Sequence, residues 1–187
     1  IIVDPADGRR PPLTQEARER LAARTAFLRP NTGTAWWLEN DLDAPGPYDH
    51  PEQRPHAERC LMGFGSTAGP PMLPVLYNNL KRIVQTDETI MILVEMVHDA
   101  RVIRMNQEHV APEIRSWLGD SVGHWEGDTL VVDTSNFRDS PSLGQASENL
   151  HVVERFTRVD KGTLLYQFTV DDPTAWTAPW TPARRTR

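Results

Sequence analysis

The feature that most constrains the fold of this chain is a series of short β-branched and aromatic segments in its second half. Seven of them follow residue 80, at residues 81–86, 89–96, 101–105, 122–125, 129–134, 150–159 and 163–170. Segments of this composition, bounded by Asp, Gly, Asn or Pro, are typical of β-strands separated by turns. The sequence therefore predicts a mainly β protein.

The connections between these segments indicate how the strands pair. Four of them are very short, at residues 87–88, 97–100, 126–128 and 160–162. Short connections join antiparallel neighbours, because a parallel pair needs a crossover of about a dozen residues or more. We therefore expect an antiparallel meander that closes into a barrel or forms a strongly curved sheet. Residues 129–134 should pair antiparallel with 122–125, and residues 150–159 with 163–170.

Residues 1–80 have a different composition, rich in proline and glycine, as in DAPGPYDHPEQRP and GFGSTAGPPMLP. Proline fixes φ and lacks an N–H donor, so we expect this segment to wrap around residues 81–187 rather than form a sheet. A length of 187 residues suits one structural domain overall. One helix is expected from Thr14 as N-cap to about residue 28, and a second, shorter one at residues 53–61.

Composition excludes several classes of function. The net charge of -6 disfavours nucleic acid or an anionic membrane surface as the main partner. No apolar run reaches the roughly 18 residues of a membrane span. The single cysteine, Cys60, excludes an internal disulfide and a Cys-rich zinc site. The chain has no Gly-rich phosphate loop, G-x-S-x-G or dinucleotide motif, so we expect no organic cofactor.

The stretch GHWEGDTLVVDTSN, residues 123–136, places a histidine and three carboxylates around one glycine. Its simplest interpretation is a hairpin in which Glu126, Gly127 and Asp128 form the turn. The alternative is a metal site that uses His124, Glu126 and Asp128. Consecutive residues at a turn rarely converge on one ion, so we expect no metal there.

Two carboxylates interrupt apolar strand faces. Glu154 shares its face with Leu150, Val152 and Phe156, and Glu95 interrupts the apolar run at residues 89–96. A buried carboxylate must find a partner, or its pKa rises. We expect Glu154 to be buried against an arginine or a histidine, either as a structural ion pair or as part of an acid/base site.

The candidate catalytic residues are His124, Glu154, His151 and Tyr166. An imidazole, a carboxylate that orients it and a phenol in one apolar cavity would suffice for acid/base chemistry on a small molecule. His124 shares a strand face with Val122, so we expect it to point inward. The candidate ligand-binding residues, which would form the walls of the cavity, are Trp125, Glu95, Phe156, Phe168 and Trp117.

Several segments resemble a family of secreted bacterial proteins without an assigned activity, among them SWLGDSVGHWEGDTLVVDTSNF and ENLHVVERFTRVDKGTLLYQFTVDDPTAWTAPW. The resemblance spans roughly residues 58–180 and is most specific from Gly119 to Phe137. It implies a periplasmic or exported protein, and a chain that begins at Ile1 fits removal of a leader. The series of hairpins is also similar to lipocalin-like barrels, by analogy alone.

Three functions therefore stay open. The first is binding of a small, partly apolar molecule in the mouth of a β-barrel, in the periplasm or outside the cell. The second is a cofactor-independent acid/base enzyme, a lyase, isomerase or hydrolase. The third is an accessory subunit that meets a protein partner through its N-terminal segment, where Trp36 and Trp37 are adjacent in a polar stretch.

Overall fold

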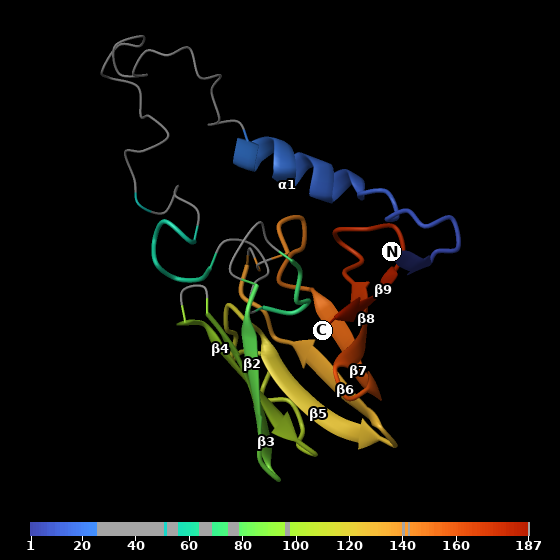
Figure 1. Ribbon diagram of the computed structural model, residues 1–187. Coiled ribbons are helices and arrows are strands. Elements are labelled where there is room, and N and C mark those ends of the chain that lie inside the picture. Colours follow the sequence, from blue (N-terminus) through green and yellow to red (C-terminus); the bar gives the residue numbers. More distant parts are fainter. Residues whose placement is uncertain are drawn as a thin grey trace, which may run out of the picture.

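The computed structural model describes residues 1–25, 51, 56–63, 69–74, 79–95, 98–139, 141 and 143–186. They form a nine-stranded sheet and one helix, α1 (Figure 1). The helix spans Gln15–Thr25. The strands are β1 Ile2–Asp4, β2 Lys81–Gln85, β3 Thr89–Val94, β4 Ala100–Met105, β5 Asp120–Glu126, β6 Thr129–Ser135, β7 His151–Asp160, β8 Thr163–Asp171 and β9 Thr181–Thr186.

The sheet is mainly antiparallel, and its strand order is β1-β9-β8-β7-β6-β5-β4-β3-β2. β5 pairs antiparallel with β6 and β7 with β8, which confirms both predicted hairpins. β4 and β5 pair in parallel, against the expected uninterrupted meander. The physical reason is the connection between them, residues 106–119, which is long enough for a crossover. The sheet is curved and does not close into a barrel.

Two strands were not predicted from the sequence. β9 carries a proline, an alanine and two arginines between its two threonines, so it lacks the large apolar and aromatic residues by which the other strands were recognised. β1 pairs antiparallel with β9 and adds a ninth strand at that edge of the sheet. The expectation that the N-terminal segment forms no part of a sheet is therefore wrong for Ile2–Asp4.

The helix begins where the sequence predicts. Thr14 is its N-cap, because the Thr14 hydroxyl accepts a hydrogen bond from the Ala17 amide at 3.0 Å. Ala17 is buried, and the Thr14 amide donates to the Ala175 carbonyl at 3.0 Å, which fixes the start of the helix to the loop before β9. The second predicted helix lies partly outside the described residues, and residues 56–60 form turns.

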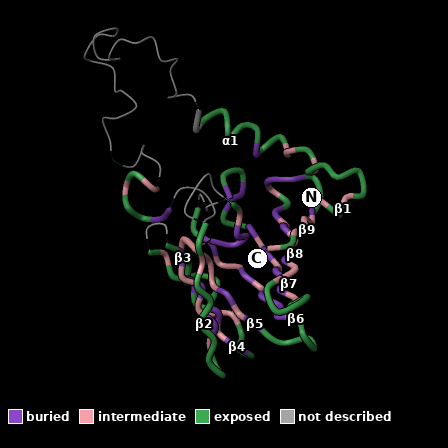
Figure 2. Tube along the Cα trace, in the orientation of Figure 1, coloured by how far each residue is buried: buried purple, intermediate pink, exposed green. Residues whose placement is uncertain are grey.

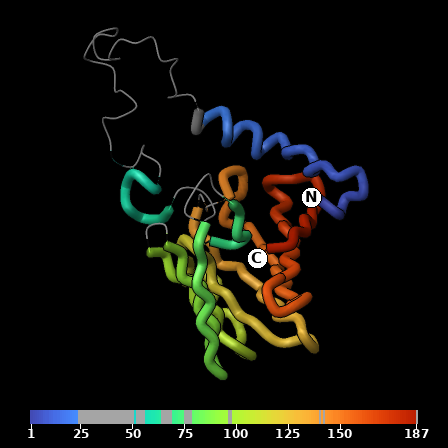
Figure 3. The backbone as a smooth tube through the Cα atoms, in the orientation of Figure 1, coloured from blue at the N-terminus to red at the C-terminus, as the bar shows by residue number. Residues whose placement is uncertain are grey.

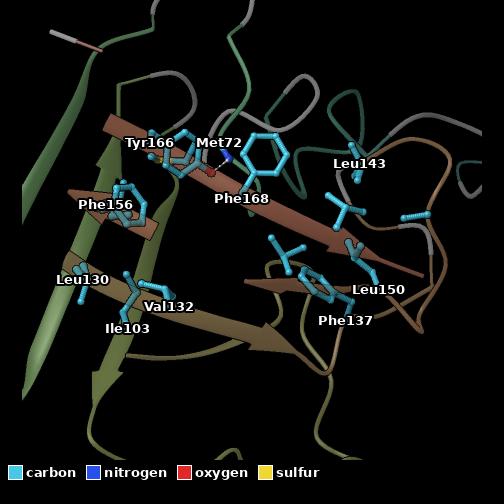
Figure 4. Close-up of a cluster of buried hydrophobic side chains, with 14 of the residues drawn as sticks. Met72, Ile103, Leu130, Val132, Phe137, Leu143, Leu150, Phe156, Tyr166 and Phe168 are labelled. Atoms are coloured by element: carbon cyan, nitrogen blue, oxygen red, sulfur yellow. Dashed lines mark hydrogen bonds between the residues drawn. The ribbon is translucent and has the colours of Figure 1, made fainter. Parts of the chain in front are cut away.

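The two faces of the sheet differ in chemistry. The inner face carries the apolar core, and Figure 4 shows its side chains packed over β6, β7 and β8. Met72, from the first 80 residues, also packs there.

Figure 2 shows that burial is strongest along the middle strands and that β2, at one edge of the sheet, is exposed along most of its length. In Figure 3, β2–β4 lie on one side of the curved sheet and β7–β9 on the other, with β5 and β6 between them.

Gly119 is conformationally required at the entrance to β5. Its φ is +72°, and a Cβ atom there would lie 2.7 Å from the Ser135 carbonyl oxygen and 2.7 Å from the Thr134 methyl group. Gly127, in the β5–β6 turn, also has a positive φ, +58°, but a Cβ atom there would meet nothing within 4 Å. A side chain at Gly119 would therefore meet both backbone strain and steric overlap, whereas a side chain at Gly127 would meet backbone strain alone.

We predict that Gly119→Ala lowers the free energy of unfolding by about 2–4 kcal/mol, because strain and overpacking add. Gly127→Ala, the matched control, should cost about 1 kcal/mol from strain alone. Urea unfolding followed by circular dichroism measures both. Equal losses for the two variants would contradict the close packing around Gly119.

Candidate functional site

A buried ion pair lies at the centre of the inner face. The Arg101 guanidinium, from β4, pairs with the Glu154 carboxylate, from β7, and both side chains are buried. The Arg101 Nε donates to the Ser121 hydroxyl at 3.0 Å, and an Nη donates to the Thr134 hydroxyl at 2.9 Å. The prediction that Glu154 is buried against an arginine is confirmed. Arg101, Ser121, Thr134 and Glu154 connect four neighbouring strands, β4 to β7.

Tyr166, on β8, extends this network. Its hydroxyl donates to the other Glu154 oxygen at 2.5 Å and accepts from the Met72 amide at 2.9 Å, the dashed line in Figure 4. Burial, and after it the charge of Glu154, raises the pKa of the Tyr166 phenol well above its usual value. The phenol therefore stays protonated and acts as a fixed donor. Glu154 and Tyr166, two of the predicted catalytic residues, do lie together.

His124 does not join them. The pairing register places His124 opposite Val131, which lies opposite Arg155, whereas Glu154 lies opposite Val132. Because side chains alternate along a strand, His124 and Glu154 lie on opposite faces of the sheet. The His124 side chain is 52% exposed and its Nε2 lies 3.2 Å from a Glu126 oxygen. The expected inward orientation of His124, and the cavity that it would share with Glu154, are therefore wrong.

The other predicted site residues lie in several places. Phe156 and Phe168 are buried and stack against Tyr166, with ring centroids 4.9 Å and 5.4 Å away. Trp125 is 47% exposed. Trp117 packs on the ring of His56 in the loops. Glu95 is exposed just after the end of β3, so its expected place within an apolar strand is wrong.

The outer face holds a polar cluster that sequence reasoning missed, and it includes the predicted site residue His151. The His109 ring bridges Asp120, at 2.9 Å, and Asp133, at 3.0 Å, and His151 also contacts Asp133 at 2.9 Å. Arg104 donates to both oxygens of Asp120. His109 comes from the 106–119 crossover, so no strand periodicity could have placed it beside β5 and β6.

The contacts within this cluster shift the pKa values of Asp133 and His151. Burial opposes ionisation of Asp133, but hydrogen bonds from His151 and His109 outweigh it, and the pKa of Asp133 is lowered. The hydrogen bond to Asp133 raises the pKa of His151 above 6.5, although burial works against it. The cluster is an ion-pair network that joins four strands, β4 to β7, and the crossover. Among the described residues, no group of three or more His, Cys, Asp or Glu is arranged to hold a metal ion.

A cleft opens on the inner face beyond the core. It has a volume of about 460 Å³ and lies between β2, at one end of the sheet, and the β7–β8 hairpin with β9 near the other end. Because β2 and β9 are far apart in the strand order, the curvature of the sheet creates this space. The apolar residues that line it are Met72, Pro74, Leu80, Ile83, Phe156 and Leu164.

The charged residues that line the cleft are mainly cations. Asn79, Lys81, Arg158, Asp160, Lys161, Gly162, Thr163, Arg184 and Thr186 complete it. Arg184 lies over the Tyr166 ring, with its Cζ 5.5 Å from the ring centroid, and donates to the Met72 carbonyl at 3.2 Å. Tyr166 and Met72 therefore connect the buried ion pair to the wall of the cleft. Phe156 is the predicted ligand-binding residue that lines it.

Comparison with known proteins gives no match to a family model, to a curated protein or to a solved structure. The helix that the structure describes is too short and too polar to span a membrane. Trp36 and Trp37, on which the accessory-subunit alternative depended, lie outside the described residues.

We predict that Glu154→Gln lowers the free energy of unfolding by about 3–5 kcal/mol, because it leaves the Arg101 charge buried without a counter-ion. The double variant Arg101→Met/Glu154→Leu should recover at least half of that loss, since a buried ion pair is often replaced by apolar residues at little cost. Urea unfolding measures both. A single-variant loss below about 1 kcal/mol would show that the ion pair is dispensable.

The outer cluster generates a prediction on pH. The raised pKa of His151 means that its pairing contributes stability that is fully present below pH 6.5 and is lost as pH rises through the folded-state pKa. We expect Asp133→Asn to lower the pKa of His151 in an NMR titration of the imidazole, and to remove that part of the stability below pH 6.5. Asp128→Asn, in the exposed β5–β6 turn, is the control and should leave the His151 titration unchanged.

Proposed function

We propose that this protein binds a small, partly apolar molecule in the cleft between β2 and the β7–β8 hairpin. The observation that carries the proposal is the cleft itself, about 460 Å³ in volume, with apolar residues contributed by both ends of the curved sheet. That volume lies within the range of about 300–1,000 Å³ that is typical of small-molecule sites. The family resemblance supports a location outside the cytoplasm.

Two features of the lining support binding rather than simple packing. Ile83 faces the cleft, yet its side chain is 47% exposed, so apolar surface is left open to a ligand. Phe156 and Leu164 form part of the opposite wall. Polar groups line the same cleft as this apolar surface, and sites that orient an amphipathic molecule combine both kinds of group.

The rigid support of the cleft also favours this function. Phe156 stacks on Tyr166, which the hydrogen bonds to Glu154 and Met72 hold in place. A wall that is fixed before binding costs less conformational entropy when a ligand arrives. The buried network therefore contributes to binding by positioning this wall, rather than by the acid/base chemistry that the sequence left open as an alternative.

The test uses N-phenyl-1-naphthylamine, a neutral apolar probe whose fluorescence rises in an apolar environment. Wild-type protein should bind it in a saturable manner. Ile83→Ser should weaken binding about fivefold, because removal of apolar contact costs about 1 kcal/mol. The matched control is Val84→Ser, the next residue of β2 on the opposite face, 41% exposed. Absence of saturable binding, or equal effects of the two variants, would refute the proposal.

A further inference from the structure

The cleft has an unusual charge for this protein. The chain carries a net charge of -6, and only two of its basic residues are lysines, Lys81 and Lys161. Both lysines line the cleft, together with Arg158 and Arg184. Among the lining residues that the structure describes, Asp160 is the one carboxylate. Four cations against one anion, on an acidic protein, mark this region as different from the rest of the surface.

Within the described residues, the two arginines among these cations interact with backbone carbonyls rather than with carboxylates. Arg158 donates to the backbone carbonyls of Asp160 and Lys161, at 3.3 Å and 3.4 Å, and Arg184 donates to the carbonyl of Met72. The Asp160 carboxylate accepts from the Gly162 amide at 2.8 Å, so it caps its own turn. In the part of the chain that the structure describes, none of the four cations forms an ion pair with a carboxylate.

Lys81 shows how its surroundings in the cleft affect a cation. It is half-buried at the start of β2, on the same face as Ile83. Burial, and after it the nearby charge of Arg184, lowers the pKa of Lys81 below 10.5. A carboxylate, sulfonate or phosphate placed near both groups would relieve this repulsion and gain charge-assisted hydrogen bonds.

We infer that the ligand of the cleft is a small amphipathic anion, whose acidic group lies against Lys81 and Arg184 and whose apolar body lies along Ile83, Phe156 and Leu164. The inference rests on the proposed function, because it assigns a chemical class to the ligand of the same cleft. A polyanion such as nucleic acid fits poorly, since the remaining surface of an acidic chain repels it.

The experiment compares N-phenyl-1-naphthylamine with 8-anilinonaphthalene-1-sulfonate, which has the same aromatic skeleton and one added sulfonate. Both are titrated fluorimetrically into the folded wild-type protein at low ionic strength. We expect the sulfonate to bind about tenfold more tightly, and this advantage to shrink as salt is added, since salt screens charge interactions. The neutral probe should show little dependence on salt.

The variants Lys81→Gln and Arg82→Gln form a matched pair. Each removes one positive charge from β2, but the two side chains lie on opposite faces of the sheet. Lys81→Gln should weaken binding of the sulfonate about fivefold or more and leave binding of the neutral probe within twofold. Arg82→Gln should change neither by more than twofold. Lys161→Gln, at the exposed turn, provides a second charge removal if Lys81→Gln fails to fold.

The outcomes test the anionic character of the ligand and the binding function of the cleft separately. Equal affinity for the two probes, or equal effects of Lys81→Gln and Arg82→Gln on the sulfonate, would overturn the anionic ligand while the apolar cleft stands. No saturable binding of either probe would overturn both. Reductive ¹³C-methylation gives an independent readout, because the chain has two lysines. The sulfonate should shift the Lys81 methyl signal in NMR spectra, and an unshifted signal would contradict its contact.

Discussion

The buried ion pair between Arg101 and Glu154 is the interaction on which the rest of the structure depends. It joins β4 to β7 across the two strands between them. The hydroxyls of Ser121 and Thr134, on those two strands, both accept hydrogen bonds from the Arg101 guanidinium and are hydrogen-bonded to each other. Charges buried this deeply are tolerated only when they are paired and hydrogen-bonded. The register of four strands is therefore coupled to one polar network, since a one-residue slip would turn a partner to the other face.

Alternation along the strands separates two kinds of polar chemistry. The inner face holds the dry network of Arg101, Glu154 and Tyr166, while the outer face holds the half-exposed cluster of Asp133 and His151. The stretch GHWEGDTLVVDTSN contributes to both faces, and its Glu126-Gly127-Asp128 segment connects β5 and β6 as a turn. Burial makes the inner network costly to disturb, whereas solvent makes the outer cluster responsive to pH.

Curvature links the fold to the proposed binding site. An open sheet whose two ends approach each other leaves a space that neither end could form alone, and here that space lies beside the buried core. Arg184 and Met72 connect the wall of the cleft to Tyr166 and so to the ion pair. The cations of the cleft form no ion pair with a carboxylate among the described residues, and Arg184 is fixed to this wall by its hydrogen bond to Met72. Groups that are held in place before binding lose less free energy to reorganisation.

The sequence by itself determined seven of the nine strands, two hairpins, the helix N-cap at Thr14 and the burial of Glu154, because these depend on local periodicity, turn residues and the cost of an unpaired carboxylate. It did not determine the face of His124, since alternation fixes only that His124 shares a face with Val122, and the packing of the whole sheet decides which face the core covers. The parallel pairing of β4 with β5, the place of His109 and the position of Lys81 and Arg184 in one cleft were decided by the tertiary structure alone. Each depends on contacts between residues distant in sequence, and local patterns carry no information about such contacts.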